Sequence, residues 1–286
     1  MFNQKFIHKA CFVAGIALAT LSSSAATVAY WDFESGVAGQ PFTPIGNPNG
    51  SGGAVDTANG ILMRGWNDFF GPSYTSSTSP NGGSLAMSNA DNHQDGYVTE
   101  GALHNWGPTA WTIETHVYLE NLGGWNTLIG RDGSSQAEAE SDFYLVNNGI
   151  DDKFRINYDS VGGQRWVLDG NYSVQINTWY ALAAVSDGST LSMWLDDGTG
   201  YAQIGSLDIT AQSAAQNGLP ATAINWTFGR GWFGGSFVDH IDGRMDNIRF
   251  SDQALTPSQL IPVPEPSMLA IAGIGASMMF IRRRSK

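Results

Sequence analysis

Cysteine is almost absent from this sequence: Cys11 is the single one, and it lies near the N-terminus. Residues 27–262 therefore have no disulfide framework and no cysteine metal site. Gly-x-Ser-x-Gly, His-Glu-x-x-His and phosphate-loop motifs are also missing, and His93, His104 and His240 lack metal-ligand spacing. The sequence thus gives no support for nucleophilic or zinc-dependent catalysis.

Basic residues are also scarce, with 14 Lys and Arg against 26 Asp and Glu in the whole chain. Six basic residues but only one acidic residue lie in the two terminal segments, which leaves residues 27–262 with eight basic and 25 acidic side chains, a net charge of −17. Such a domain is a poor partner for nucleic acid and for anionic lipid surfaces. Cations and neutral sugars stay open as partners, and solubility alone explains much of the charge.

No long stretch of residues 27–262 has the apolar period of a helix, whereas short alternating runs broken by Gly, Asn and Asp are frequent. About a dozen such runs predict an all-β, two-sheet antiparallel β-sandwich. Residues 36–83 are expected to be mostly loop, and Thr256–Leu260 one helical turn beginning at Pro257. The expected strands are Thr27–Glu34, Gly96–Glu100, Trp111–Leu119, Asn126–Arg131, Asp142–Asn147, Lys153–Tyr158, Arg165–Asp169, Thr178–Ser186, Thr190–Leu195, Ile224–Arg230 and Arg244–Phe250.

The N-terminus has the order of parts of a secretory signal peptide. Lys5 and Lys9 are followed by an apolar region, 10–21, and by small residues up to Ala26. We expect residues 1–26 to be removed on export.

The C-terminal segment 263–286 begins with Val263, Pro264, Glu265 and Pro266. The apolar stretch Met268–Ile281 follows, and as a helix it would be about 21 Å long, a marginal membrane span. The basic end is expected to stay on the cytoplasmic side; it comprises Arg282, Arg283, Arg284, Ser285 and Lys286.

This tail closely resembles the PEP-CTERM sorting signal of Gram-negative bacteria. The resemblance implies transient anchoring in the inner membrane and processing by an exosortase-type enzyme. It also implies a destination in the cell envelope or outside the cell, in cells that make exopolysaccharide. A plain C-terminal anchor is the alternative.

Residues 27–262 form the expected central domain, and a series of short motifs in it resembles a laminin-G-like domain of the concanavalin A-like lectin and glucanase superfamily. The resemblance implies a jelly-roll sandwich but no particular function. The matching segments, in order, are Gly83–Leu85, Asp95–Val98, Trp111–Glu114, Leu128–Gly133, Asn177–Tyr180, Val185–Gly188, Gly243–Phe250 and Ala254–Thr256.

The same resemblance implies a structural calcium ion, held by an acid of the first strand and one of the last. Asp246 matches the last-strand acid, and Asp32 or Glu34 could supply the other. Met245 and Ile248 are both expected to point inward although they are three residues apart, which predicts a bulge that re-aims Asp246. Capping of loop amides is the alternative role for Asp246.

Glu138, Glu140 and Asp142 are two residues apart and would share one strand face if their strand began early, as paired carboxylates of glycosidases require. Their Ser- and Ala-rich surroundings favour a solvated acidic loop, with calcium binding as the next possibility. We therefore assign no catalytic residue.

Sugar could bind at two places. Glu114 and His116 form a polar row on one strand face, which is either part of a groove or an ordinary wet face. Trp232 and Phe233 stand between glycines and offer flat apolar faces for a pyranose, although aromatics also close the ends of a sandwich. The same choice applies to Trp66, Phe69, Phe70 and Tyr74.

The sequence thus predicts an exported, non-enzymatic sandwich that binds or organises extracellular polysaccharide. A glycoside-processing enzyme and a purely structural matrix or adhesion protein are the alternatives.

Overall fold

Strands of both sheets are antiparallel throughout, as the short alternating runs predict. The computed structural model describes residues 27–42, 53–65, 72–80, 83–89, 96–98, 103–132 and 140–263. The first sheet has the order β14 (Ala202–Asp208), β13 (Thr190–Asp196), β12 (Trp179–Ser186), β7 (Trp111–Leu119), β18 (Gly243–Ser251), β5 (Ala86–Asn89) and β4 (Ser73–Thr75), and β1 (Thr27–Trp31) also pairs with β18. The second has the order β11 (Arg165–Asp169), β10 (Lys153–Asp159), β9 (Phe143–Asn148), β8 (Asn126–Arg131), β15 (Trp226–Phe228), β6 (Gly96–Val98), β3 (Leu62–Gly65) and β2 (Ala54–Val55).

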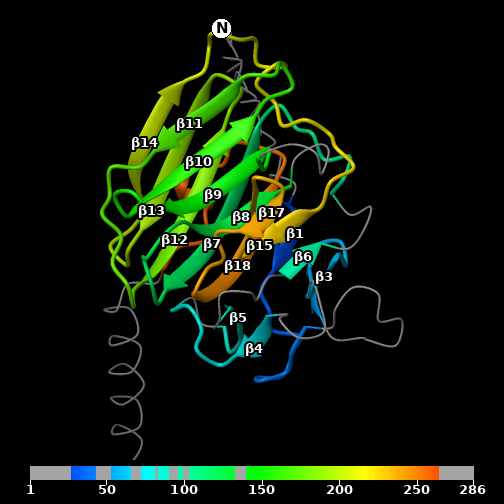
Figure 1. The fold of residues 1–286 in the computed structure, drawn as a ribbon, viewed down its shortest axis with the longest axis vertical. Helices are drawn as coiled ribbons and strands as arrows, with labels where there is room; N and C mark the ends of the chain where they lie inside the picture. Colours follow the sequence, from blue (N-terminus) through cyan, green and yellow to red (C-terminus); the bar gives the residue numbers. More distant parts are fainter. Residues whose placement is uncertain are drawn as a thin grey trace, which may run out of the picture.

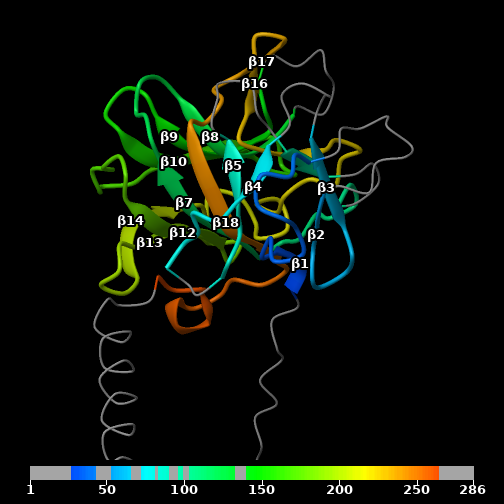
Figure 2. The same ribbon diagram turned by 90° about the horizontal axis from the view of Figure 1, so that it is seen from below.

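Two smaller elements lie outside these sheets. A hairpin consists of β16 (Gly231–Phe233) and β17 (Ser236–Val238), and the predicted helical turn is the 3-10 helix η1 (Pro257–Gln259). Figures 1 and 2 show the resulting layers: the hairpin lies outside the second sheet, and the segment after β18 lies outside the first sheet. The outer face of each sheet is therefore partly covered.

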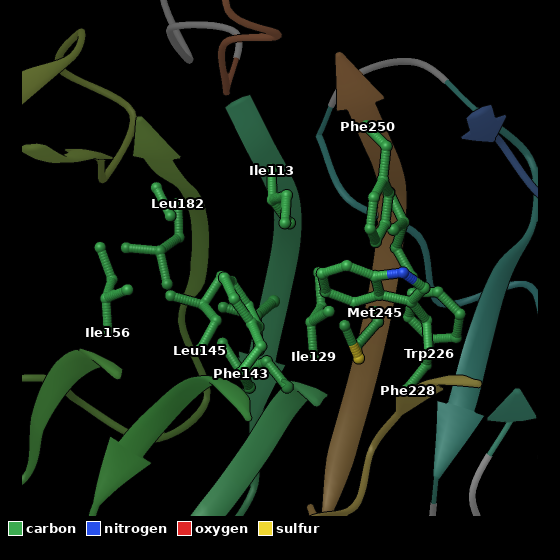
Figure 3. Close-up of a cluster of buried hydrophobic side chains, with 14 of the residues drawn as sticks. Ile113, Ile129, Phe143, Leu145, Ile156, Leu182, Trp226, Phe228, Met245 and Phe250 are labelled. Carbon is green, nitrogen blue, oxygen red and sulfur yellow. The ribbon is translucent and has the colours of Figure 1, made fainter. Parts of the chain in front are cut away.

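The core fills the space between the sheets and is rich in aromatic rings. Trp226 and Phe250 meet edge to face with centroids 4.9 Å apart, and Trp31, Phe143 and Phe228 pack around them. Figure 3 shows side chains from both sheets meeting in this interior. Because aromatic rings bury large areas, this cluster is a main source of the sandwich's stability.

The predicted bulge in the last strand is confirmed. The pairing of β18 with β7 shifts between Asp246 and Arg249, and Met245 and Ile248 are both fully buried. Asn247 has a φ of 50°, in the left-handed region that short polar side chains tolerate. Asp246 still pairs with His116, so the extra residue lies between Asp246 and Arg249 and lets Met245 and Ile248 both point inward.

Where they are described, residues 36–83 are mostly loop, as expected, but they also contain three short strands. The described stretches include β2, β3 and β4, which extend the two sheets, and β5, β14 and the β16–β17 hairpin are further strands that the alternation did not predict. These strands are short and take their pairing from distant segments, as β3 does from β6. The two-residue period needs a longer run to be visible.

None of the helices within the described ranges is long and apolar enough to cross a membrane. The expected signal peptide, residues 1–26, and the expected tail helix, Met268–Ile281, lie outside those ranges.

Candidate functional site

The β16–β17 hairpin separates the two aromatic residues that stood out in the sequence. Trp232 is 8% exposed and packs edge to face on Phe237, with centroids 5.3 Å apart. Phe233, its neighbour on β16, is 55% exposed because successive side chains of a strand face opposite ways. Phe233 is the residue that presents an open ring to solvent.

The hairpin is fixed to the outer face of the second sheet by Tyr144. The Tyr144 hydroxyl donates to the Trp232 carbonyl at 2.6 Å, and the Ser141 amide donates to the same carbonyl at 2.8 Å. A Cβ at Gly231 would lie 2.4 Å from the Tyr144 ring, so glycine is required for this close approach. The position of Phe233 therefore depends on β9.

A pocket of about 330 Å³ lies beside this hairpin. Tyr144, Val146 and Asn157 form its floor; Tyr144 pairs directly with Asn157 across β9 and β10, so their side chains share the outer face. The complete lining is Trp125, Glu140, Tyr144, Val146, Asn157, Phe233 and Asp239. Aromatic walls and a few polar groups thus converge on one cavity.

The polar groups of the pocket are held in different ways. Glu140 forms an ion pair with Arg165 at 2.9 Å. Burial raises the pKa of Asp239 to about 6, so this carboxyl changes charge near neutral pH. The side-chain oxygen of Asn157 is buried and has no hydrogen-bond partner among the described residues. A ligand hydroxyl in the pocket could donate to it.

The three-acid pattern splits in the structure. Asp142 is buried and paired with Arg131 at 2.6 Å, whereas Glu140 reaches the pocket and Glu138 lies outside the described residues. The solvated acidic loop expected here is therefore wrong for Asp142.

Glu114 and His116 are both buried, at 2% and 1% exposure, so the expectation that they line an open or wet strand face is wrong. Residues 255–263, which we call the strap, cover this part of β7. Glu114 accepts from the Ile261 amide at 2.9 Å, and His116 Nε2 donates to the Ile261 carbonyl at 2.9 Å. Burial lowers the pKa of His116 to about 4, which keeps the ring neutral.

The three residues expected to hold calcium serve as hydrogen-bond acceptors. Asp246 accepts from the amides of Asn247 at 2.8 Å and Ser79 at 3.1 Å, and Glu34 accepts from the Ser84 amide at 2.8 Å. Asp32 accepts from the Glu34 amide at 3.1 Å. Burial, opposed by these hydrogen bonds, raises the pKa of Asp246 to about 7.

In the part of the chain that the structure describes, no three His, Cys, Asp or Glu side chains are grouped to hold a metal ion. Capping of loop amides, the alternative named for Asp246, is what its contacts provide. Calcium binding stays a prediction.

The remaining sequence candidates fall into two groups. Tyr74 is buried and its hydroxyl donates to the Gly53 carbonyl at 3.0 Å, so it closes the core. Of the sorting motif, Val263 is described and buried. The others lie outside the described residues: Trp66, Phe69, Phe70, Pro264, Glu265, Pro266, Arg282, Arg283 and Arg284.

Comparison with protein families identifies the sandwich. A laminin G-type family model, described as the concanavalin A-like lectin/glucanases superfamily, matches residues 91–261, more than half of the chain, so the protein belongs to this superfamily. A second model, the PEP-CTERM protein-sorting motif, matches residues 262–285. This tail marks an exported protein sorted to the cell envelope and implies processing by an exosortase. No curated protein matches the chain.

Solved structures with the same fold include domain 4 of AbnA, a GH43 extracellular arabinanase from Geobacillus stearothermophilus, in complex with arabinotriose. It is 16% identical, with 82% of this chain and 96% of that chain covered and a TM-score of 0.56. The binding domain of botulinum neurotoxin DC, in complex with rat synaptotagmin II, is 9% identical, with 82% and 49% covered and a TM-score of 0.51. At these identities the likeness concerns the fold.

Proposed function

We propose that this exported protein binds extracellular glycan, without catalysis, in the pocket beside the β16–β17 hairpin. The observation that carries the proposal is the exposed Phe233 ring at the edge of a cavity that also contains Trp125 and polar side chains. A flat apolar ring beside hydrogen-bonding groups suits a sugar, whose ring has an apolar face and a polar rim. The arabinotriose bound to the AbnA domain supports the proposal, because that domain has the same fold.

The charges around the pocket favour a neutral sugar over an acidic one. Glu140 and Asp239 both line the pocket, and Arg165 is already paired with Glu140 and Asp159. Arg155 is likewise paired, with Asp169. A uronic acid would therefore meet two carboxyls, and like charges close together cost free energy.

The placement of the pocket also suits an anchored protein. The pocket is beside the β16–β17 hairpin, which lies outside the second sheet, whereas the strap, which ends at Val263, lies outside the first sheet (Figure 2). A domain held at its tail would present the pocket away from the attachment point, toward extracellular polymer.

Replacing Phe233 by alanine should weaken glycan binding about 2- to 12-fold, since an aromatic contact contributes roughly 0.5 to 1.5 kcal/mol. Phe233 is exposed, so the fold should be unaffected. The measurement is retention of the full chain in detergent on a panel of neutral and acidic polysaccharides, with calcium and then with a chelator.

Val37→Ala is the matched control, because Val37 is 66% exposed and does not line the pocket. Equal retention of wild type and Phe233→Ala would contradict the assignment of the pocket. A wild-type protein that binds no polysaccharide would leave a structural matrix or adhesion protein as the better account.

Glycoside hydrolysis is a second candidate, because two carboxyls, Glu140 and Asp239, line one pocket. The raised pKa of Asp239, about 6, would suit a general acid, and the ion-paired Glu140 would be the carboxylate. Release of reducing ends from a bound polysaccharide, lost in both Asp239→Asn and Glu140→Gln, would favour this function over binding alone.

A further inference from the structure

The strap is packed into the domain along an apolar seam. Leu255 and Leu260 are each 5% exposed and lie in a cluster with Ala183 and Val185 of β12, against which Trp194 and Tyr201 also pack. Residues 255–260 therefore have a small hydrophobic core of their own on the outer face of the first sheet.

Polar contacts hold the next residues by their backbone. Both backbone groups of Ile261 are bonded: its amide donates to Glu114, and its carbonyl accepts from His116 Nε2 and from the Tyr201 hydroxyl at 2.7 Å. Arg249 also donates to the Gln259 carbonyl at 2.7 Å. Buried or half-buried side chains from β7, from β18 and from Tyr201, just before β14, thus converge on this extended segment.

The last of these contacts reaches the sorting motif. The Val263 amide donates to Asp196 Oδ2 at 2.9 Å, and Val263 is 6% exposed while Asp196 is fully buried. The sorting-motif match begins at residue 262, so the folded domain and the motif overlap at Pro262 and Val263. The first residues of the motif are part of the sandwich.

We propose that the hydrogen bond from Val263 to Asp196, which we call the clamp, sets the limit of tail processing. The peptide bond that is cut then lies on the C-terminal side of Val263, and the mature domain keeps the strap as its docked C-terminus. A protease needs an accessible, extended backbone. A segment that is buried and hydrogen-bonded must therefore unfold locally before a protease can bind and cut it. The cut hydrolyses one peptide bond, with the hydroxyl of water passing to the new carboxylate and a proton to the new amine. The inference does not depend on glycan binding.

Asp196→Asn tests the clamp with little change to the turn after β13. Asp196 Oδ1 accepts from the amides of Gly198 and Gly200, at 2.8 and 2.9 Å. The asparagine oxygen can keep both bonds, which turns its NH2 group toward the Val263 amide and places donor against donor. Asp187→Asn is the matched control, because Asp187 Oδ1 also caps a hairpin turn, at Ser189 and Thr190, without touching the strap.

The hydrogen-exchange rate of the Val263 amide, measured on the full chain in detergent, shows directly whether this amide is hydrogen-bonded. Prolines flank Val263 and have no amide hydrogen, so the Val263 signal is isolated from its neighbours. We expect the wild-type Val263 amide to exchange at least about 100-fold more slowly than an open chain, and at least about tenfold faster in Asp196→Asn, with no change in Asp187→Asn.

The intact mass of the protein recovered from its own cells locates the cut, and the expected mature chain ends at Val263 or later. A mature chain that ends before Val263, a chain that keeps its whole tail, or a wild-type Val263 amide that exchanges at the open-chain rate would overturn the proposal.

Discussion

Arg249→Met is expected to lower the free energy of unfolding by about 3 to 5 kcal/mol, because it leaves a buried carboxylate without its cation. Glu114 is 2% exposed, and its Oε1 accepts from Arg249 Nε at 2.5 Å. The other oxygen, Oε2, accepts from the Ile261 amide, so the pair also supports the strap. Methionine keeps the length of the side chain but supplies neither charge nor hydrogen bonds. Urea unfolding followed by tryptophan fluorescence measures the loss.

The sign of the pH effect gives this prediction a second test. Burial already raises the pKa of Glu114, with Arg249 opposing that shift, so removing Arg249 raises the pKa further. The destabilisation should therefore shrink as the pH falls and the carboxyl takes up a proton.

Arg155→Met is the control for Arg249→Met. The pair of Arg155 with Asp169 is of the same kind but more exposed, at 21% and 46% of the two side chains, and its loss should cost less than about 1 kcal/mol. Equal losses in the two variants would contradict a buried role for the Glu114 pair.

Asp246 should make the sandwich less stable as the pH rises from about 4 to about 7. Its folded-state pKa of about 7 is above the ordinary value of 3.8, so within this window the unfolded chain has lost a proton that the folded chain keeps. The contribution of Asp246 to stability falls by about 1.4 kcal/mol for each pH unit, roughly 4 kcal/mol over the whole window, and levels off above it. Urea unfolding at half-unit pH intervals measures this contribution as the difference between wild type and Asp246→Asn, since the shifted pKa values of His116 and Asp239 act equally in both proteins.

The matched control is Asp208→Asn. Asp208 is exposed, and hydrogen bonds from Thr210 lower its pKa, so its contribution to stability is lost only as the pH falls below about 4. The slope above pH 4 should therefore persist in Asp208→Asn. The same slope in wild type and Asp246→Asn would contradict the assignment. The predicted calcium site can be tested in the same experiment. A bound cation stabilises the carboxylate, so millimolar calcium should reduce the pH dependence of stability that Asp246 contributes in wild type, if the predicted site exists.

The long strands were predictable because each carries enough alternation to fix its period. Trp111–Leu119, Asn126–Arg131 and Arg165–Asp169 have the expected bounds, and the bulge at Asp246 followed from two inward residues three apart. The two-residue β2 could not be found this way, since its pairing with β3 is set by tertiary contacts.

The candidate site was predictable only at its aromatic edge. Glycines around Phe233 suggested an exposed ring, but nothing in the sequence distinguished it from Trp232 until the strand direction was known. The alternation of β9 contained a signal for Tyr144 on an outer face, whereas Asp239 follows a short hairpin strand and has no periodic pattern.

For Glu114 and His116, the predicted strand face was right but the predicted exposure was wrong. The alternation placed both on the outer face of β7, which is correct, but a period cannot reveal that the strap covers that face.

The most direct test of glycan binding in this pocket is a hydrogen-exchange footprint of the full chain in detergent, with and without the polysaccharide that retains it best. The account predicts slower exchange in peptides that cover residues 140–146, 153–159 and 231–239, which contain most of the pocket lining. Peptides from β12, β13 and the strap, on the opposite face, should be unchanged. Protection confined to that opposite face, or no protection at saturating polysaccharide, would contradict the account.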